Sequence, residues 1–345
     1  MKRTLVIRLS ALGDVAMLVP VLYSAARHYP GTIFYLLTKS PLLPIFEYRP
    51  ENVVVIPVFT TKEHQGIFGL GRLIRQLATR NFDEVIDAHN VLRSQQVRMF
   101  FKLKGKPVSV INKGRQDKRA LTRRHNKQLV PIKTSTERYH DAFKQLGYDF
   151  PLTFQSIFAD KTRDFGLIEP IVGAKNCTWI GIAPFAKHEG KQYPLAKMEE
   201  VIRMLSVNHQ TKIFLFGGGK EEKAQLETWA ARYEHVVSVA GLFSFSSELL
   251  LMSYLQVMLT MDSGNMHLAS LVATPVVSVW GATHPYAGFY GYGQHPDNIV
   301  EERQLSCRPC SVFGNKPCFW GDYACLERIA PEKIVEQINH VLSIS

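Results

Sequence analysis

The turn at residues 261–269 carries side chains suited to holding a charged ligand. Asp262, Ser263, Gly264 and His267 stand between an apolar run that predicts a strand and a run that predicts a helix. Free N–H groups and the dipole at a helix N-terminus attract anions, and glycine lets a ligand approach the backbone. Because a carboxylate would repel a phosphate, we expect Asp262 to cap the turn or to hold a sugar hydroxyl. An ordinary capped helix with a surface histidine is the alternative interpretation.

Two further candidates follow other predicted strands. Gly13 and Asp14 come directly after the first strand, and Lys191 lies in a loop after a later one. A carboxylate opposite an anion-binding surface suits transfer from a diphosphate-activated donor. The carboxylate would take the proton of the acceptor hydroxyl, while the lysine and the helix N-terminus would stabilise the leaving diphosphate. A plain helix cap for Asp14 and a solvated loop lysine for Lys191 are the alternatives.

Four of the five cysteines gather near the end of the chain, as Cys307-x2-Cys310-x7-Cys318-x6-Cys325. Four thiolates in a short stretch are typical of a structural zinc site, and a reducing compartment disfavours disulfides. The spacing lacks the second close pair of a zinc ribbon. Structural zinc and packed free thiols therefore both stay open.

The positive charge of the chain is concentrated in residues 98–138. This segment holds thirteen Lys and Arg against two acidic residues, and so accounts for the whole formal net charge of +11. Such a patch predicts an anionic partner, either a phosphorylated glycan, a membrane surface or a nucleic acid. Phe100, Phe101 and Tyr139 are too few aromatic side chains for a platform that stacks bases. A merely solvated surface is the alternative.

The chain shows no sign of membrane insertion or export. No apolar run approaches the ~20 residues of a spanning helix. The first residues lead straight into a strand, without the apolar core of a signal peptide. We therefore expect a cytoplasmic protein.

An alternation of strands and helices has to position these side chains. It predicts two doubly wound α/β domains in tandem, with strand-end loops of both facing a central cleft. The pattern G-x-G-x-x-G is absent after the first strand, which argues against a nicotinamide enzyme. The expected divisions are a first domain at 1–150, a linker at 151–176, a second domain at 177–330 and a closing helix at 331–345. The expected strands are 4–9, 33–37, 53–56, 84–87 and 107–111 in the first domain, and 178–183, 212–216, 255–260 and 275–280 in the second.

Four segments together resemble the family 9 glycosyltransferases, the ADP-heptose:lipopolysaccharide heptosyltransferases. In this sequence Tyr193 stands where that family more often has Trp, and His284 where Asp is common. The segments are Leu12-Gly13-Asp14-Val15 with Pro20, Lys191-Gln192-Tyr193-Pro194, Asp262-Ser263-Gly264-Asn265-Met266-His267 and Gly281-Ala282-Thr283-His284-Pro285.

The resemblance implies a GT-B fold and an inverting, metal-independent transfer that needs no cofactor. It implies that Asp14 is the general base and that Lys191 binds the diphosphate of a nucleotide-sugar donor. It also implies a lipid-linked anionic glycan as acceptor, reached at the inner face of the cytoplasmic membrane. Within the basic segment 98–138, we expect Arg119, Arg123 and Arg124 to contact that acceptor. The residues placed around the donor are Gly13, Lys191, Glu222, Asp262, Ser263, Gly264 and His267.

Two other functions are compatible with the same residues. A sugar-nucleotide epimerase or hydrolase on the same fold would act on the donor without a glycan acceptor. A nucleic-acid-binding module would use the basic segment 98–138, although the scarcity of aromatic residues there leads us to expect no nucleic-acid partner.

Overall fold

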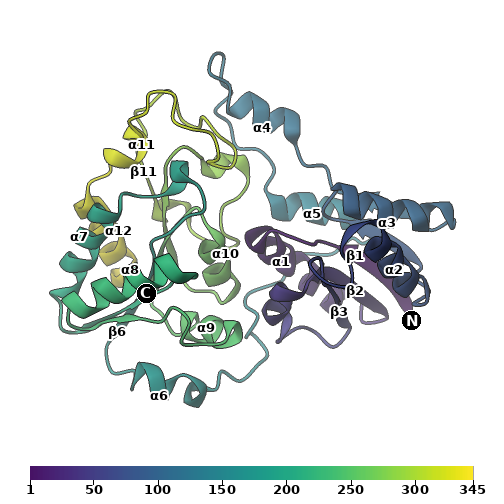
Figure 1. The fold of residues 1–345 in the computed structure, drawn as a ribbon, viewed down its shortest axis with the longest axis horizontal. Helices are drawn as coiled ribbons and strands as arrows, with labels where there is room; N and C mark the ends of the chain where they lie inside the picture. Colours follow the sequence, from purple (N-terminus) through teal and green to yellow (C-terminus); the bar gives the residue numbers. More distant parts are fainter. Residues whose placement is uncertain (345) are drawn as a thin grey trace. The chain divides into compact units, whose positions relative to one another are not determined.

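The predicted alternation forms two separate parallel β-sheets in the computed structural model, which describes residues 1–344 (Figure 1). The chain divides into two units, each with its own sheet. Unit 1 comprises Met1–Lys113 and Ser135–Lys161, and unit 2 comprises Gly114–Thr134 and Thr162–Ser345. The expectation of two doubly wound α/β domains is confirmed.

The sheet of unit 1 is built outward from the first strand in both directions. Its strands read as apolar runs because helices cover both faces, and Leu5, Val6 and Ile7 are fully buried. In spatial order the strands are β3 (Val53–Val58), β2 (Thr32–Lys39), β1 (Lys2–Ile7), β4 (Glu84–Asp87) and β5 (Val108–Val110). The helices are α1 (Leu12–His28), η1 (Ser40–Phe46), α2 (Gly66–Ala78), α3 (Leu92–Leu103) and α5 (Ser135–Lys144).

Helix α1 is the central helix of unit 1. Every residue from Val15 to Ala26 is buried, so the helix is apolar all round rather than amphipathic. The regular part begins at Leu12 and runs through Pro20.

The sheet of unit 2 has the same doubly wound plan. In spatial order its strands are β11 (Ile299–Glu301), β10 (Val276–Trp280), β9 (Val257–Met261), β6 (Thr178–Ala183), β7 (Thr211–Leu215) and β8 (Val236–Ser238). The helices and helical turns used below are α4 (Arg115–Leu121), η2 (Phe165–Leu167), α6 (Glu169–Val172), η3 (Glu189–Lys191), α7 (Leu195–Ser206), α8 (Lys220–Arg232), α10 (Gly264–Leu271), α11 (Ala324–Glu327) and α12 (Pro331–Ile344).

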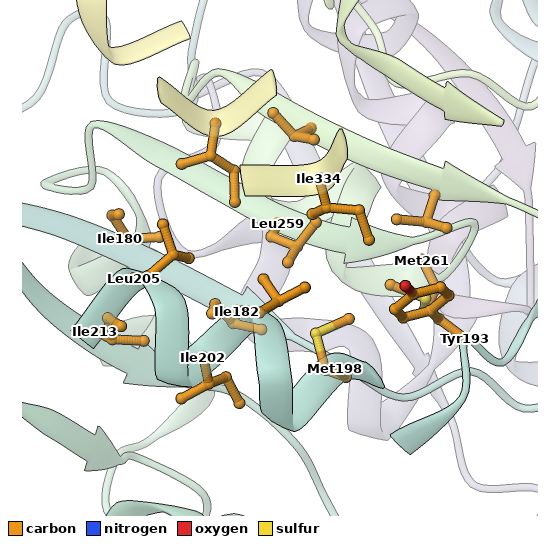
Figure 2. Close-up of a cluster of buried hydrophobic side chains, with 14 of the residues drawn as sticks. Ile180, Ile182, Tyr193, Met198, Ile202, Leu205, Ile213, Leu259, Met261 and Ile334 are labelled. Atoms are coloured by element: carbon orange, nitrogen blue, oxygen red, sulfur yellow. The ribbon is translucent and has the colours of Figure 1, made fainter. Parts of the chain in front are cut away.

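The main core of unit 2 lies where α7 and α12 pack together on one face of the sheet. Figure 2 shows Met198, Ile202 and Leu205 of α7 directed at strand side chains, with Ile334 of α12 beside them. The spacing of the three α7 residues is that of one helical face, which is the reason this segment forms a helix against the sheet. The core fixes the ends of the central strands, from which the loops of the candidate site depart.

The expected domain boundaries differ from the observed units in two places. The division falls between Lys161 and Thr162, within the expected linker 151–176, and η2 and α6 of that linker belong to unit 2. Residues 114–134, expected in the first domain, pack on unit 2. Lys118 lies 4.1 Å from the centre of the Phe289 ring, and the Ile132 N–H donates to the Tyr286 carbonyl at 3.1 Å. Among residues 1–344 the structure contains no helix with the length and hydropathy needed to span a bilayer.

Candidate functional site

Each sheet has one point at which the order of its strands reverses. In unit 2 the chain moves from β6 outward to β7 and β8, then returns to β9 on the other side of β6. Ligands of open α/β sheets bind beyond the carboxyl ends of the strands at such a point. Ala183 of β6 pairs with Thr260 of β9, so both strands end at the same level. The loops that carry Lys191 and Asp262 therefore leave the sheet side by side.

Lys191 and Asp262 form a buried ion pair at this reversal point. The Lys191 Nζ lies 2.8 Å from Asp262 Oδ2, and the two side chains are 15% and 4% exposed. The contact is an ion pair without a hydrogen bond, because its angles do not meet hydrogen-bond geometry at Oδ2. The sequence analysis treated the two residues as separate ligand contacts. The structure brings them together, and it does not support Asp262 as the cap of the turn.

Tyr193 anchors the Lys191 loop to the core. Its ring is fully buried next to Met261, the residue before Asp262 (Figure 2). Its hydroxyl donates to the Ile329 carbonyl at 2.8 Å, which satisfies the buried polar group. Tyr193 is thus a packing residue, and it sets where the loop that carries Lys191 lies.

One glycine leaves room for the Lys191 stem, and a second lets the lysine's loop approach Ala282 and Gly314 closely. A Cβ on Gly314, whose φ is +72°, would lie 2.6 Å from Lys191 Cγ, so a larger residue would collide with the lysine. A Cβ on Gly190 would lie 2.9 Å from both the Ala282 Cβ and the Gly314 carbonyl oxygen. The lysine therefore lies on the segment that carries the four C-terminal cysteines. Sequence analysis missed Gly314 because nothing near it in the chain points to Lys191.

The turn after β9 has the expected strand–turn–helix form. Ser263 is at the N-cap of α10, but its side chain makes no capping hydrogen bond to the helix. Its hydroxyl instead shares a hydrogen bond of 3.1 Å with the Thr260 hydroxyl. Ser263 therefore does not cap the helix with its side chain. Gly264 begins the helix, and His267 is buried in its first turns.

Glu222 lies at the glycine turn that follows β7. Its Oε2 accepts a hydrogen bond of 2.8 Å from the Gly218 N–H. Because β7 is the neighbour of β6, this turn opens at the same edge of the sheet as the Lys191 loop. The carboxylate therefore orders the turn, and its role toward a ribose stays a prediction.

His284 belongs to a buried charge network behind the β10 loop. Its Nε2 lies 3.6 Å from Glu301 Oε2, and Arg308 Nη2 lies 3.1 Å from the same oxygen. Burial lowers the pKa of His284, which Glu301 opposes and Arg308 reinforces. Arg308 also donates to the carbonyls of Gly281 and Glu302, both at 2.6 Å. Sequence analysis missed Arg308, since a single arginine between cysteines carries no signal of such contacts.

In unit 1 the corresponding reversal point lies between β1 and β4. Ile7 pairs with Asp87, so Arg8 and Ala88 leave the sheet together, and Arg8 Nη1 donates to the Ala88 carbonyl at 3.0 Å. Arg8 Nη2 lies 2.6 Å from Asp14 Oδ2, which also accepts from the Ala11 N–H at 3.3 Å. Within residues 1–344 no hydrogen bond or ion pair is made by Asp14 Oδ1. The carboxylate is thus held by one oxygen while the other is available to a ligand.

His89 lies behind this carboxylate and was also missed. Its Nδ1 accepts from the Leu9 N–H at 3.3 Å, and its side chain is buried. Burial, which is the largest cause, and the positive charges of Arg8 and Lys113 together lower the pKa of His89 to about 3. The imidazole is therefore neutral at pH 7. A lone histidine after a short strand gives no sign of this position until the order of the strands is known.

The three arginines assigned to acceptor binding lie on the surface of residues 114–134, which belong to unit 2. Arg119, Arg123 and Arg124 are exposed. The Arg124 guanidinium lies 3.7 Å from the centre of the Phe319 ring, a cation–π contact within unit 2. Their expected place in the first domain is wrong, because the segment folds onto unit 2.

The sequence matches one protein family and resembles characterised members of it. The family model described as glycosyltransferase family 9 (heptosyltransferase) matches residues 70–316. A lipooligosaccharide heptosyltransferase 2 of Campylobacter jejuni is 25% identical over 95% of this chain and 95% of its own length. A lipopolysaccharide heptosyltransferase 1 of Pseudomonas aeruginosa is 24% identical over 99% of this chain and 98% of its own.

A solved structure has the same fold. The E. coli heptosyltransferase WaaC, determined with ADP, superposes with a TM-score of 0.70 at 19% identity, covering 98% of this chain and 99% of that one. At that identity the likeness establishes the GT-B fold alone.

Proposed function

The chain belongs to glycosyltransferase family 9, and from that premise we propose that it moves a heptose from ADP-heptose to the inner core of lipopolysaccharide. One observation carries the donor half of the proposal: the buried Lys191–Asp262 ion pair at the strand reversal of unit 2. A buried lysine at that place, next to the N-terminus of α10, suits a diphosphate. The ADP bound by the E. coli relative is a ligand of this chemistry.

Lys191 acts on the leaving group. As the bond between the anomeric carbon and the diphosphate oxygen breaks, negative charge grows on ADP, and a preorganised cation stabilises it. The lysine exchanges its contact with Asp262 for the diphosphate, and Asp262 turns to a donor hydroxyl. No metal ion is required in this scheme, since Lys191 supplies the positive charge. Ser263, Gly264, His267 and Glu222 border the same loops and complete the donor site.

Asp14 acts on the acceptor. Its carboxylate removes the proton of the attacking hydroxyl, while that oxygen forms the new bond to the anomeric carbon from the face opposite ADP. Inversion at the anomeric carbon follows from a single displacement. Arg8 holds one carboxylate oxygen at 2.6 Å and so fixes the direction of the other.

Transfer can be tested with ADP-heptose and a lipopolysaccharide truncated before its first heptose. The expected result is ADP release that depends on the acceptor, with an inverted anomeric linkage in the product. Lys191→Ala should lower kcat/KM by about 30- to 1,000-fold, as for loss of one electrostatic contact to the transition state. Lys187→Ala, an exposed lysine in the same loop, is the matched control and should have little effect.

Other outcomes of this assay identify the alternatives. ADP release at an equal rate without acceptor would show a hydrolase, and altered donor configuration would show an epimerase. Either result would refute transfer as the main activity. Family membership favours transfer over both.

The lipid-linked acceptor requires contact with a membrane, and we assign this contact to α2 and α3 of unit 1. Leu92, Met99 and Leu103 recur at the spacing of one helical stripe on α3 and are 78%, 52% and 81% exposed. They lie opposite the buried face of the helix, which includes Val97 and Phe101. An exposed apolar stripe of this kind marks an interaction surface.

The charge of the two helices favours an anionic bilayer as the partner. Phe68 at the start of α2 is 94% exposed, and α2 packs beside α3. Neither helix contains an acidic residue. The exposed cations of the two helices are Arg72, Arg75 and Lys102, and the exposed Lys104 follows directly after α3. Each such cation near an anionic surface contributes about 1 kcal/mol, and the apolar side chains add insertion into the headgroup region.

Sedimentation with phospholipid vesicles tests this surface. Leu92→Gln with Leu103→Gln should weaken binding to vesicles containing anionic lipid by at least about tenfold, because two apolar side chains no longer insert. Val207→Gln, an exposed apolar residue of unit 2, is the control. Unchanged binding would refute the α2–α3 assignment. If changing Arg119, Arg123 and Arg124 to Glu abolishes binding instead, the contact lies on residues 114–134.

A further inference from the structure

Four cysteines of unit 2 share a cavity that the proposed transfer does not use. Cys307, Cys310, Cys318 and Cys325 all line one cavity of about 240 Å³. The fifth cysteine, Cys177, is not among the residues that line it. Between the end of β11 at Glu301 and the start of α11 at Ala324 the chain forms neither helix nor strand. A segment of this length without secondary structure needs another source of order.

The first cysteine pair is fixed to the sheet by backbone contacts. The N–H of Cys310 donates to the Ala282 carbonyl at 3.1 Å, directly beyond β10. Between the two cysteines, Arg308 is buried and donates to the carbonyls of Gly281 and Glu302. Cys307 and Cys310, two residues apart on either side of this anchor, therefore have a set position. A short C-x2-C turn is the usual half of a four-thiolate site.

The second pair approaches the same cavity from the other end of the segment. The Cys318 N–H donates to the Tyr323 hydroxyl at 3.3 Å, and that hydroxyl donates to Glu189 Oε2 at 2.8 Å. Cys325 lies in α11, a single turn that starts just after Tyr323, and its side chain is buried. All four cysteines thus border one cavity, and they come to it from two fixed ends of the segment.

Cations surround the thiols. The Lys127 Nζ donates to the carbonyls of Ser306 and Cys307, at 3.1 and 2.7 Å. Arg308 and Arg328 also line the cavity. A divalent ion with four thiolates carries a charge of −2, which the buried Arg308, the half-buried Lys127 and the exposed Arg328 next to it offset. Outer groups of this kind are part of a metal site.

We propose that Cys307, Cys310, Cys318 and Cys325 bind one structural Zn²⁺ ion, in a site that orders residues 302–323. The ion displaces four thiol protons and forms four zinc–sulfur bonds, so no oxidant or reductant takes part. Among residues 1–344, three metal-binding donor atoms lie within 4.8 Å of one another only at His209, Glu234 and His235. The sulfur atoms of the four cysteines are therefore farther apart than the sulfur atoms of an occupied four-thiolate site. Binding therefore draws the segment inward.

Metal analysis of tag-free protein purified under reducing conditions tests the site. The expected content is about one zinc per chain, as for a structural four-thiolate site. Cys307→Ser combined with Cys310→Ser should lower it to background. Cys177→Ser is the matched control outside the cavity and should keep the ion. His209→Ala with His235→Ala should also keep it, which excludes zinc held by that exposed group.

Replacement of zinc by Co²⁺ tests the ligands even if the cysteine variants misfold. The wild-type protein should show the sulfur-to-cobalt charge-transfer bands and the strong visible bands of a tetrahedral four-thiolate ion. A folded, active and metal-free preparation would overturn the proposal, as would zinc retained by the double cysteine variant. One iron per chain, lost in that variant, would keep the thiolate site and overturn zinc as its ion.

Discussion

Asp14 is held by an arginine that leaves one carboxylate oxygen available. Both protein contacts to the side chain, from Arg8 and from the Ala11 N–H, fall on Oδ2. An ion pair at a partly exposed site contributes little to stability, typically ~0–1 kcal/mol. Its value here is positional, because a base must point its free oxygen at the hydroxyl it deprotonates.

Asp14→Asn should therefore lower kcat by roughly two to four orders of magnitude, with donor affinity unchanged. The amide keeps the shape of the side chain but cannot take the proton. Rapid-quench measurement of transfer, with donor binding followed by calorimetry, would check this. Asp160→Asn removes another carboxylate of unit 1 that pairs with an arginine, Arg27 at 2.7 Å, and should leave transfer intact. Comparable loss in both variants would remove Asp14 from the role of base.

His89 makes the stability of unit 1 sensitive to acid. Its folded pKa, about 3, lies below the ordinary value of 6.5, so between these values the unfolded chain binds the proton more readily. Stability from this group is complete above pH 6.5 and is lost as the pH falls toward 3. At pH 4.5 the loss should be roughly 2–3 kcal/mol, since one pKa unit corresponds to 1.36 kcal/mol.

Replacing the imidazole should remove this loss. His89→Asn keeps an acceptor for the Leu9 N–H and cannot be protonated, so its free energy of unfolding should fall less between pH 7 and pH 4.5 than that of the wild type. Urea titrations at the two pH values measure the difference. The exposed His28 is the control, and its Asn variant should behave as the wild type. Equal acid sensitivity in His89→Asn would contradict the buried neutral histidine.

At the scale of elements, the Lys191 loop depends on a glycine more than a hundred residues away. Gly314 and Gly293 have nearly the same φ, +72° and +71°, but only Gly314 has a neighbour in the way of a Cβ, the Lys191 stem. Gly293 has nothing within 4 Å of that position. Comparing alanine variants at Gly314 and Gly293 therefore distinguishes the effect of backbone strain from the effect of displacing Lys191.

Gly314→Ala should lower kcat/KM for the donor by about ten- to a hundredfold, because a shift near 1 Å in a charge-stabilising group costs that much. Gly293→Ala should lower the melting temperature as much as Gly314→Ala does, because both glycines have a positive φ, but it should leave transfer unchanged. Steady-state kinetics and melting temperatures of the two variants decide the matter. If both variants lose activity equally, the glycine contact does not position Lys191.

The sequence was sufficient for those elements whose signal is local. The strands ending at Asp87 and Met261 were predicted closely, because runs of apolar residues and turn chemistry lie within one window. Arg8, His89, Arg308 and Gly314 were not predictable, because their partners depend on which strands are neighbours. The place of residues 114–134 was missed for the same reason, since a basic surface segment does not reveal which sheet it packs on.

At the scale of the whole molecule, donor contacts should be confined largely to unit 2. ADP should slow hydrogen exchange at residues 184–194, 217–222 and 262–267, since a ligand protects the segments that it holds closed. ADP-heptose should extend the protection to residues 12–14, as the assignment of Gly13 to the donor requires. Mass spectrometry of exchanged peptides would show both effects. Protection by ADP alone in unit 1 would contradict the assignment of the nucleotide to unit 2.

The chain passes between the two units three times, at residues 113–114, 134–135 and 161–162. A single proteolytic cut in residues 123–131 would therefore give two fragments that each contain parts of both units, held together only by the contacts inside the units. The same topology means that unit 2 cannot be obtained as one uninterrupted fragment. Residues 162–345 alone would lack Arg124 and Lys127, and so would lose their contacts with the Phe319 ring and with the carbonyls of Ser306 and Cys307. Adding residues 114–134 back as a peptide should restore the stability of the fragment. Residues 114–134 are thus an insertion in the chain of unit 1 that folds as part of unit 2.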